Sequence, residues 1–163
     1  MDANTRTAEP TSSFAPSHDD AALAGQPVGY WSWAAQNAVV THIRSMLAEQ
    51  GLTQPQWWIL NQTADGRRPR AEVVGVLQGY LAAGSQVIGD GIDELAARGL
   101  LTEDPTGHLQ LTDAGRSLRD RTAVRQREVR ERVHAGITDE EYVATLKVLQ
   151  RMIHNVGGKA WHH

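Results

Sequence analysis

The sequence predicts a mainly α-helical fold with a single small β-hairpin. Apolar residues recur at helical spacing through most of 28–158, and glycines or capping residues stand where each run begins or ends. Two short strand-like runs, 100–103 and 108–111, flank the turn signal Asp-Pro-Thr-Gly at 104–107. A chain of 163 residues is long enough to bury one sizeable core of this kind.

The composition excludes several classes of protein. No run approaches about eighteen apolar residues, so we expect no membrane-spanning helix. No apolar segment follows the N-terminus as it would in a secretory signal. Because the chain contains no cysteine, it cannot form a disulfide framework, a thiolate zinc site or a Cys nucleophile. We therefore expect a cytoplasmic protein.

Residues 1–27 are predicted to form a disordered acidic tail. They carry one Arg against four acidic residues and contain three prolines, and Phe14 and Leu23 are among their few large apolar side chains. Such a segment cannot bury enough apolar surface to offset its ordering entropy. The folded domain is therefore expected over 28–158, followed by a short C-terminal tail at 159–163.

The helices of this domain are predicted from periodicity and from capping residues. Thr53 with Gln56, and Thr138 with Glu141, form capping boxes, and Gly51 ends the first helix. A short basic loop, 67–70, separates the second helix from the third. The expected helix ranges are 28–50, 53–65, 71–80, 85–98, 113–135 and 138–156.

Two short helices followed at once by a hairpin are in the order of a winged helix-turn-helix. In such a unit the second helix of the pair presents its N-terminal residues to base edges in the DNA major groove. We therefore expect the DNA-binding part at 52–112.

The long flanking helices, 28–50 and 113–158, carry more apolar residues than one small winged-helix unit can bury. We expect these helices to pack on a second copy of the chain and form a homodimer. A monomer with a closed helical cap is the alternative. The residues expected in the dimer interface are Trp31, Val39, Leu146, Leu149 and Ile153.

Three local motifs, in this order and spacing, resemble the MarR family (multiple antibiotic resistance regulators). They are Gly-Leu-Thr-Gln-Pro-Gln-Trp at 51–57, Leu-Ala-Ala-Arg-Gly-Leu-Leu at 95–101 and Leu-Gln-Leu-Thr-Asp-Ala-Gly at 109–115. The resemblance covers roughly 28–158. It implies a cytoplasmic homodimer that binds a pseudo-palindromic operator in double-stranded DNA and responds to a small aromatic or phenolic ligand.

The candidate DNA contacts lie on the second helix of the pair, in the wing and in the basic segments beside them. Gln86 can pair bidentately with adenine, and Ser85 suits a phosphate. Arg116 and Arg119 lie closest to the wing within the basic run 116–132, and we interpret the rest of that run as a solvated helix with pairs such as Glu128 with Arg132. The full set is Arg67, Arg68, Arg70, Ser85, Gln86, Gly89, His108, Arg116 and Arg119.

The helix at 85–98 and the wing depart from the usual pattern of the MarR family. Gly89 and Asp90 stand where Thr and Arg are common, and Asp90, Asp93 and Glu94 make the helix acidic. The wing turn, 104–108, contains no Arg, although an Arg usually reaches the minor groove from there. These departures favour an alternative function: a degenerate winged-helix dimer that acts as a ligand-binding or protein-interaction module without operator recognition.

Aromatic residues gather in the first two helices, where the effector pocket of the MarR family usually lies. Trp33, His42, Trp57 and Trp58 are therefore candidate lining residues for an aromatic ligand. The alternative is that they are core residues, since Trp57 occupies a position that is usually apolar and buried.

Motifs for catalysis are missing from the sequence. It contains no phosphate-binding glycine loop, no nucleophile elbow and no His pair at metal-ligand spacing before the terminal His162 and His163. We expect no enzymatic activity, no metal, no cofactor and no membrane partner.

Overall fold

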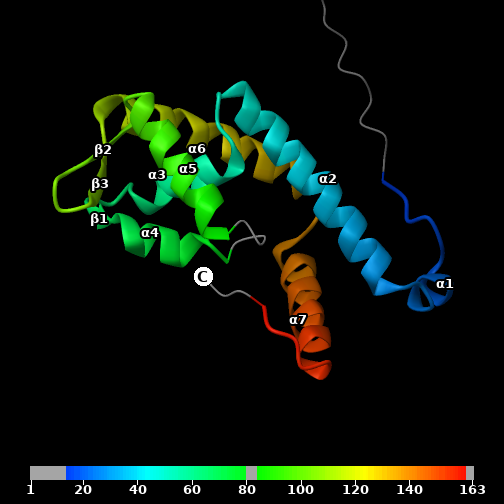
Figure 1. Cartoon of the computed structure of the whole chain (residues 1–163). Coiled ribbons are helices and arrows are strands. Elements are labelled where there is room, and N and C mark those ends of the chain that lie inside the picture. The colour runs from blue at the N-terminus through cyan, green and yellow to red at the C-terminus, as the bar shows by residue number, and fades with distance from the viewer. Residues whose placement is uncertain (1–13, 80–83, 161–163) are drawn as a thin grey trace, which may run out of the picture. The chain divides into compact units, whose positions relative to one another are not determined.

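A computed structural model describes residues 14–79 and 84–160 (Figure 1). The chain divides into two units, residues 1–36 and 37–163, and each unit is described by itself. The boundary lies inside helix α2 (Val28–Glu49), whose sequence-based range agrees to within one residue. The second unit begins at residue 37, within the folded domain expected over 28–158.

In the first unit, part of the segment predicted to be disordered is helical. Helix α1 (Asp20–Ala24) begins at Asp19, whose carboxylate accepts a hydrogen bond from the Ala22 amide at 2.9 Å. This local cap favours one helical turn, which the composition of the segment does not reveal. No residue between 14 and 36 is buried, and residues 1–13 lie outside the described residues.

The core of the second unit surrounds α3 (Gln54–Gln62), which contacts α4 (Arg70–Leu77), α5 (Gly84–Ala97) and α6 (Asp113–Val133). The predicted capping box of α3 is confirmed, since the Thr53 amide donates to Gln56 Oε1 at 3.0 Å and the Gln56 amide donates to Thr53 Oγ1 at 3.4 Å. The largest fully buried apolar residues are Leu47, Ile59, Leu60, Val73, Leu77, Ile88, Ile92, Leu95, Leu101 and Leu109.

The predicted hairpin is confirmed, and a third strand, which leads directly into the N-terminal end of α4, joins it (Figure 1). Strands β2 (Leu101–Glu103) and β3 (His108–Leu111) pair antiparallel with Leu101 opposite Leu111. The expected basic loop at 67–70 is wrong in part, because β1 (Arg68–Pro69) pairs with β3 and the sheet order is β1-β3-β2. A strand of only two residues is too short to show an alternating apolar pattern in the sequence. Its presence depends on pairing with β3, which lies about 40 positions further along the chain.

Helix α4, the first helix of the helix-turn-helix pair, is shorter than the sequence suggests. It was expected over 71–80, whereas α4 ends at Leu77 with Gln78 as its C-cap, next to Gly79. Val73 and Leu77 are buried as expected, but Val74 is only half-buried. Residues 80–83, which include most of the expected turn, lie outside the described residues.

The two C-terminal helices agree with their expected ranges. Thr112 caps α6, and a capping box at Thr138 and Glu141 opens α7 (Asp139–Asn155). No residue of α7 is buried: within the described part of the chain its apolar residues are exposed or half-buried. No helix in residues 14–79 and 84–160 is long and apolar enough to cross a membrane.

Candidate nucleic-acid interface

Helix α5 has one buried face and one exposed face. Ile88, Ile92 and Leu95 are fully buried, because α5 packs on α3 and α4. The first turn is exposed on the other side: Ser85 and Gln86 are open to solvent, and the Val87 side chain is 44% exposed. The side chains of this turn can therefore contact a large partner, such as a DNA duplex, without any rearrangement of the core.

Each acidic side chain of α5 has a partner. Nε2 of Gln86 donates to Asp90 Oδ1 at 2.7 Å, and Nε2 of Gln56 donates to Glu94 Oε2 at 2.7 Å. Asp93 is the acid that a cation neutralises, with 2.8 Å between its Oδ1 and Nη1 of Arg70. The acidic helix thus repels phosphate less than its sequence suggests.

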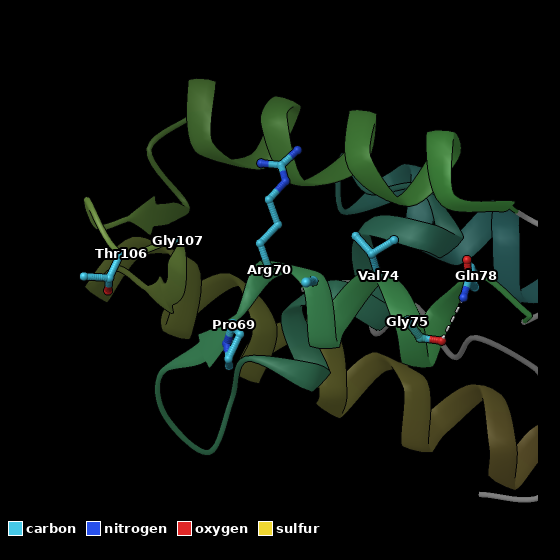
Figure 2. Close-up of a pocket in the computed structure, with 8 residues that line it drawn as sticks. Pro69, Arg70, Val74, Gly75, Gln78, Thr106 and Gly107 are labelled. Carbon is cyan, nitrogen blue, oxygen red and sulfur yellow. Dashed lines mark hydrogen bonds between the residues drawn. The ribbon is translucent and has the colours of Figure 1, made fainter.

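Arg70 braces three elements at the candidate interface. From the start of α4 its side chain extends toward α5 (Figure 2), where it meets Asp93 and donates to the Gly89 carbonyl at 3.2 Å. It also donates to Glu103 Oε2 of β2 at 3.0 Å. The hydrogen bond to Asp93 raises the pKa of Arg70 above its usual range, against the opposing effect of burial, and the same bond lowers the pKa of Asp93.

An open hollow of about 630 Å³ lies beside Arg70, between α4 and the wing turn (Figure 2). Ala71, Val74, Gly75 and Gln78 line it from one face of α4. Thr106 and Gly107 line it from the wing turn, with Pro69 and Arg70 beside them.

The wing turn is held by the carboxylate of Asp104. Its Oδ1 accepts hydrogen bonds from the Thr106 amide at 2.8 Å and from the His108 amide at 3.1 Å. Arg67 forms an ion pair with the same carboxylate. The wing, which has no arginine in its own sequence, therefore receives one from the residue before β1. No local signal in the sequence reveals this, because the pairing of β1 with β3 brings Arg67 there.

The remaining candidate arginines form weaker, exposed pairs. Arg68 lies 2.9 Å from Glu72, and Arg116 lies 2.7 Å from Asp113. Arg119 pairs with Asp120 and donates from Nε to Asn61 at 3.3 Å. Exposed pairs of this kind contribute about 0–1 kcal/mol, so a phosphate can displace the carboxylate.

The expected pair of Glu128 with Arg132 in the basic run is replaced by a different one. Glu128 pairs with Arg125, which also lies 3.6 Å from Glu49 of α2. A spacing of three residues places these side chains on the same face of α6 just as a spacing of four does.

No protein-family model matches this sequence, and no curated protein matches it. Many solved structures match its fold. The PcaV transcriptional regulator of Streptomyces coelicolor matches with a TM-score of 0.67 and 23% identity, over 82% of this chain and 100% of that chain. A MarR-family protein of Mycobacterium tuberculosis, solved in complex with DNA, matches with a TM-score of 0.61 and 20% identity, over 78% of this chain and 98% of that chain.

This chain has the fold of the MarR regulators. CouR from Rhodococcus jostii, solved with p-coumaroyl-CoA bound, matches with a TM-score of 0.63 and 21% identity, over 78% of this chain and 91% of that chain. The fold class predicted from the sequence is confirmed.

The residues suggested for a ligand pocket are placed in different surroundings in this MarR fold. Trp57 is 8% exposed and belongs to the core, and Trp58 is half-buried against it. Trp33 lies in the first unit and is 61% exposed. His42, on α2, lines two adjoining hollows of about 320 and 270 Å³ together with Arg132 of α6.

The residues suggested for a dimer interface are not buried within one copy of the MarR fold. Leu146 is 41% exposed, and Val39, Leu149 and Ile153 are half-buried. Trp31, in the first unit, is exposed as well. At the start of α7 the Tyr142 ring lies 4.5 Å from the His134 ring, which ties this helix to the end of α6.

Proposed function

We propose that this chain is a DNA-binding transcriptional regulator that acts as a homodimer in the cytoplasm and is released from its operator by a small aromatic ligand. The observation that carries the proposal is the exposed first turn of α5 beside the wing. A winged-helix unit that presents Ser85, Gln86 and Val87 outward has the geometry needed to read the major groove.

The proposed DNA contacts divide into two kinds. Gln86 reads a base and Ser85 contacts a phosphate, with the backbone of Gly89 close to the groove. Arg67, Arg68, Arg116 and Arg119 exchange their exposed carboxylate partners for phosphates, and His108 contacts the backbone from the wing. Arg70 remains a brace within the protein, because it has three partners and its side chain is only 28% exposed.

The proposed dimer is supported by the exposed apolar residues of α7. Leu146, Leu149 and Ile153 recur at helical spacing, and in one copy Leu146 is exposed while Leu149 and Ile153 are only half-buried. Two copies related by a twofold axis can cover these stripes, together with Trp31 and Val39 of α2. A twofold dimer also requires an operator with two related half-sites.

The proposed ligand site is the groove between α2 and α6. Ala38, Val39 and Val133 make one part of it apolar, and His42 and Arg132 line its polar part. Glu49 and Glu128 also line the polar part, where both are paired with Arg125. Among the described residues, Arg132 forms no ion pair, so it can meet a carboxylate. An aromatic acid fits this combination. Bordetella bronchiseptica BpsR, which shares 24% identity, has its DNA binding regulated by 6-hydroxynicotinic acid.

The DNA proposal is tested with fragments from around the gene for this chain, at two or more salt concentrations. A regulator binds one fragment saturably, with an affinity that falls as salt rises. Gln86→Ala should weaken operator binding by about 1–3 kcal/mol and leave binding to random DNA nearly unchanged. Equal loss on both kinds of DNA would show that Gln86 reads no base.

The ligand proposal is tested by screening phenolic acids with tryptophan fluorescence, from Trp58 or Trp33, and with thermal shift. Arg132→Gln should abolish the shift, whereas Arg127→Gln, on the same helix but outside the groove, should retain it. If no aromatic acid binds at millimolar concentration, the chain is not a sensor of this kind.

One observation favours a second candidate function, a winged-helix module that binds a protein or a ligand without recognising an operator. Arg67, Arg68 and Arg70 all have acidic partners, which leaves little free positive charge near α5. Such a module would show neither sequence preference nor a salt slope in the DNA experiment. We propose no enzymatic activity, since the solved structures that this chain resembles are transcriptional regulators.

A further inference from the structure

Gln86 and Asp90 form a hydrogen-bonded pair on the exposed face of α5. Nε2 of Gln86 donates to Oδ1 of Asp90 at 2.7 Å, and both side chains are open to solvent. The bond uses one of the two N–H groups of Gln86 and fixes the direction of its amide. Oε1 and the second N–H of Gln86 remain available, as does the second oxygen of Asp90.

Asp90 differs from the other two acids of its helix. Asp93 is neutralised by Arg70. Glu94 lies one helical turn beyond Asp90, farther from the N-terminal end of α5, and accepts a hydrogen bond from the side-chain amide of Gln56. In the part of the chain that the structure describes, no cation lies within ion-pair distance of Asp90. Its charge is therefore uncompensated at the place where a base edge would lie.

A carboxylate in the major groove is tolerated only where a base offers it a hydrogen-bond donor. The donors available there are N4 of cytosine and N6 of adenine, whereas guanine and thymine present acceptors. Adenine also places its N7 acceptor beside the amino group, which repels a carboxylate. Cytosine is thus the base that best satisfies Asp90.

We propose that Asp90 is a base-reading residue that selects cytosine. Gln86, oriented by Asp90, reads adenine at an adjacent base pair, where Oε1 accepts from N6 and the free N–H donates to N7. This inference rests on the proposed function, because it requires that α5 enters the major groove.

The test is a binding selection from a random duplex library with the full-length chain. The wild type should enrich a site with cytosine at one position of each half-site. Asp90→Asn should lose that preference at this position alone. Glu94→Gln is the matched control, because it makes the same change of charge on the same helix and should keep the wild-type site.

A cycle of protein and DNA changes tests the contact directly. Replacing the selected C·G pair by T·A should weaken wild-type binding about 10- to 100-fold. The same replacement should change the affinity of Asp90→Asn little, and that of Glu94→Gln as much as the wild type. Circular dichroism and thermal melting verify that each variant is folded, which the exposure of Asp90 favours.

The outcomes separate this inference from the function on which it rests. If Asp90→Asn keeps the cytosine preference of the wild type, Asp90 reads no base, and operator binding stands without it. If the folded wild type enriches no sequence at all, the proposed regulator function fails as well.

Discussion

Arg70 and Arg116 lie close to the candidate interface, yet they are held differently. Arg70 bonds two carboxylates, of Asp93 and Glu103, and its side chain is 28% exposed. Arg116 bonds one carboxylate and the Leu111 carbonyl, and half of its side chain is exposed. We expect Arg116→Ala to lower the log–log salt slope of DNA binding by about 1, because one phosphate contact is lost. Arg70→Ala should leave the slope nearly unchanged and lower the melting temperature instead.

Fluorescence anisotropy across a salt series, combined with thermal melts of the free protein, measures both effects. Equal slope losses for the two variants would show that Arg70 leaves its partners when DNA binds.

The pair of Asp93 with Arg70 makes stability depend on pH. Because Arg70 lowers the pKa of Asp93, the unfolded chain binds this proton more readily than the folded chain. The stabilisation is therefore complete above the ordinary carboxyl pKa and is lost as the pH falls through the lowered folded-state pKa. Near neutral pH we expect a higher melting temperature for the wild type than for Asp93→Asn. The difference between the two melting temperatures should disappear below about pH 4. A difference that does not vary with pH would contradict this.

At the scale of one helix, the two glycines in the middle of α5, Gly89 and Gly91, have different surroundings. A Cβ on Gly91 would lie 3.0 Å from Cδ1 of the fully buried Ile59, whereas a Cβ on Gly89 would meet only the Arg70 guanidinium at 3.8 Å. Gly89→Ala should raise the free energy of unfolding by about 0.5–1 kcal/mol through helix propensity. Gly91→Ala should lower it by about 1 kcal/mol, because overpacking exceeds that gain.

Urea unfolding of both variants measures the two effects. An equal gain for Gly91→Ala would mean that α3 and α5 can separate at no cost.

At the scale of the whole molecule, the exposed apolar residues of α7 determine the expected assembly. Leu146→Asp places a carboxylate within the proposed interface and should weaken dimerisation by on the order of a hundredfold. Ala144→Asp makes the same change of charge at an exposed position on the opposite side of α7 and should remain dimeric. Multi-angle light scattering distinguishes the two. A well-folded Leu146→Asp dimer would remove α7 from the interface.

The helices of residues 28–158 follow from the sequence, because their signals are local, whereas the single turn of α1 was missed. The capping boxes at Thr53 and Thr138 lie where the sequence places them, and the ranges of α2, α5, α6 and α7 agree with periodicity to within about two residues. Each of these signals joins residues at most a few positions apart. The exposed first turn of α5, with Gln86 on it, was likewise predictable from the order of the elements.

The tertiary structure alone decided how the charges are arranged. The pairing of β1 with β3 brings Arg67 to Asp104 of the wing, and Arg70 reaches a glutamate 33 positions away. The structure also explains Gly91 and Gly115 as close contacts, since a Cβ on Gly115 would overlap the Leu100 carbonyl. Such contacts depend on how segments that are distant in the sequence pack together. Helical periodicity and capping residues are local signals and do not predict that packing. Within 28–158 the sequence by itself determined which helices form, and packing determined which arginines keep exposed side chains at the candidate interface.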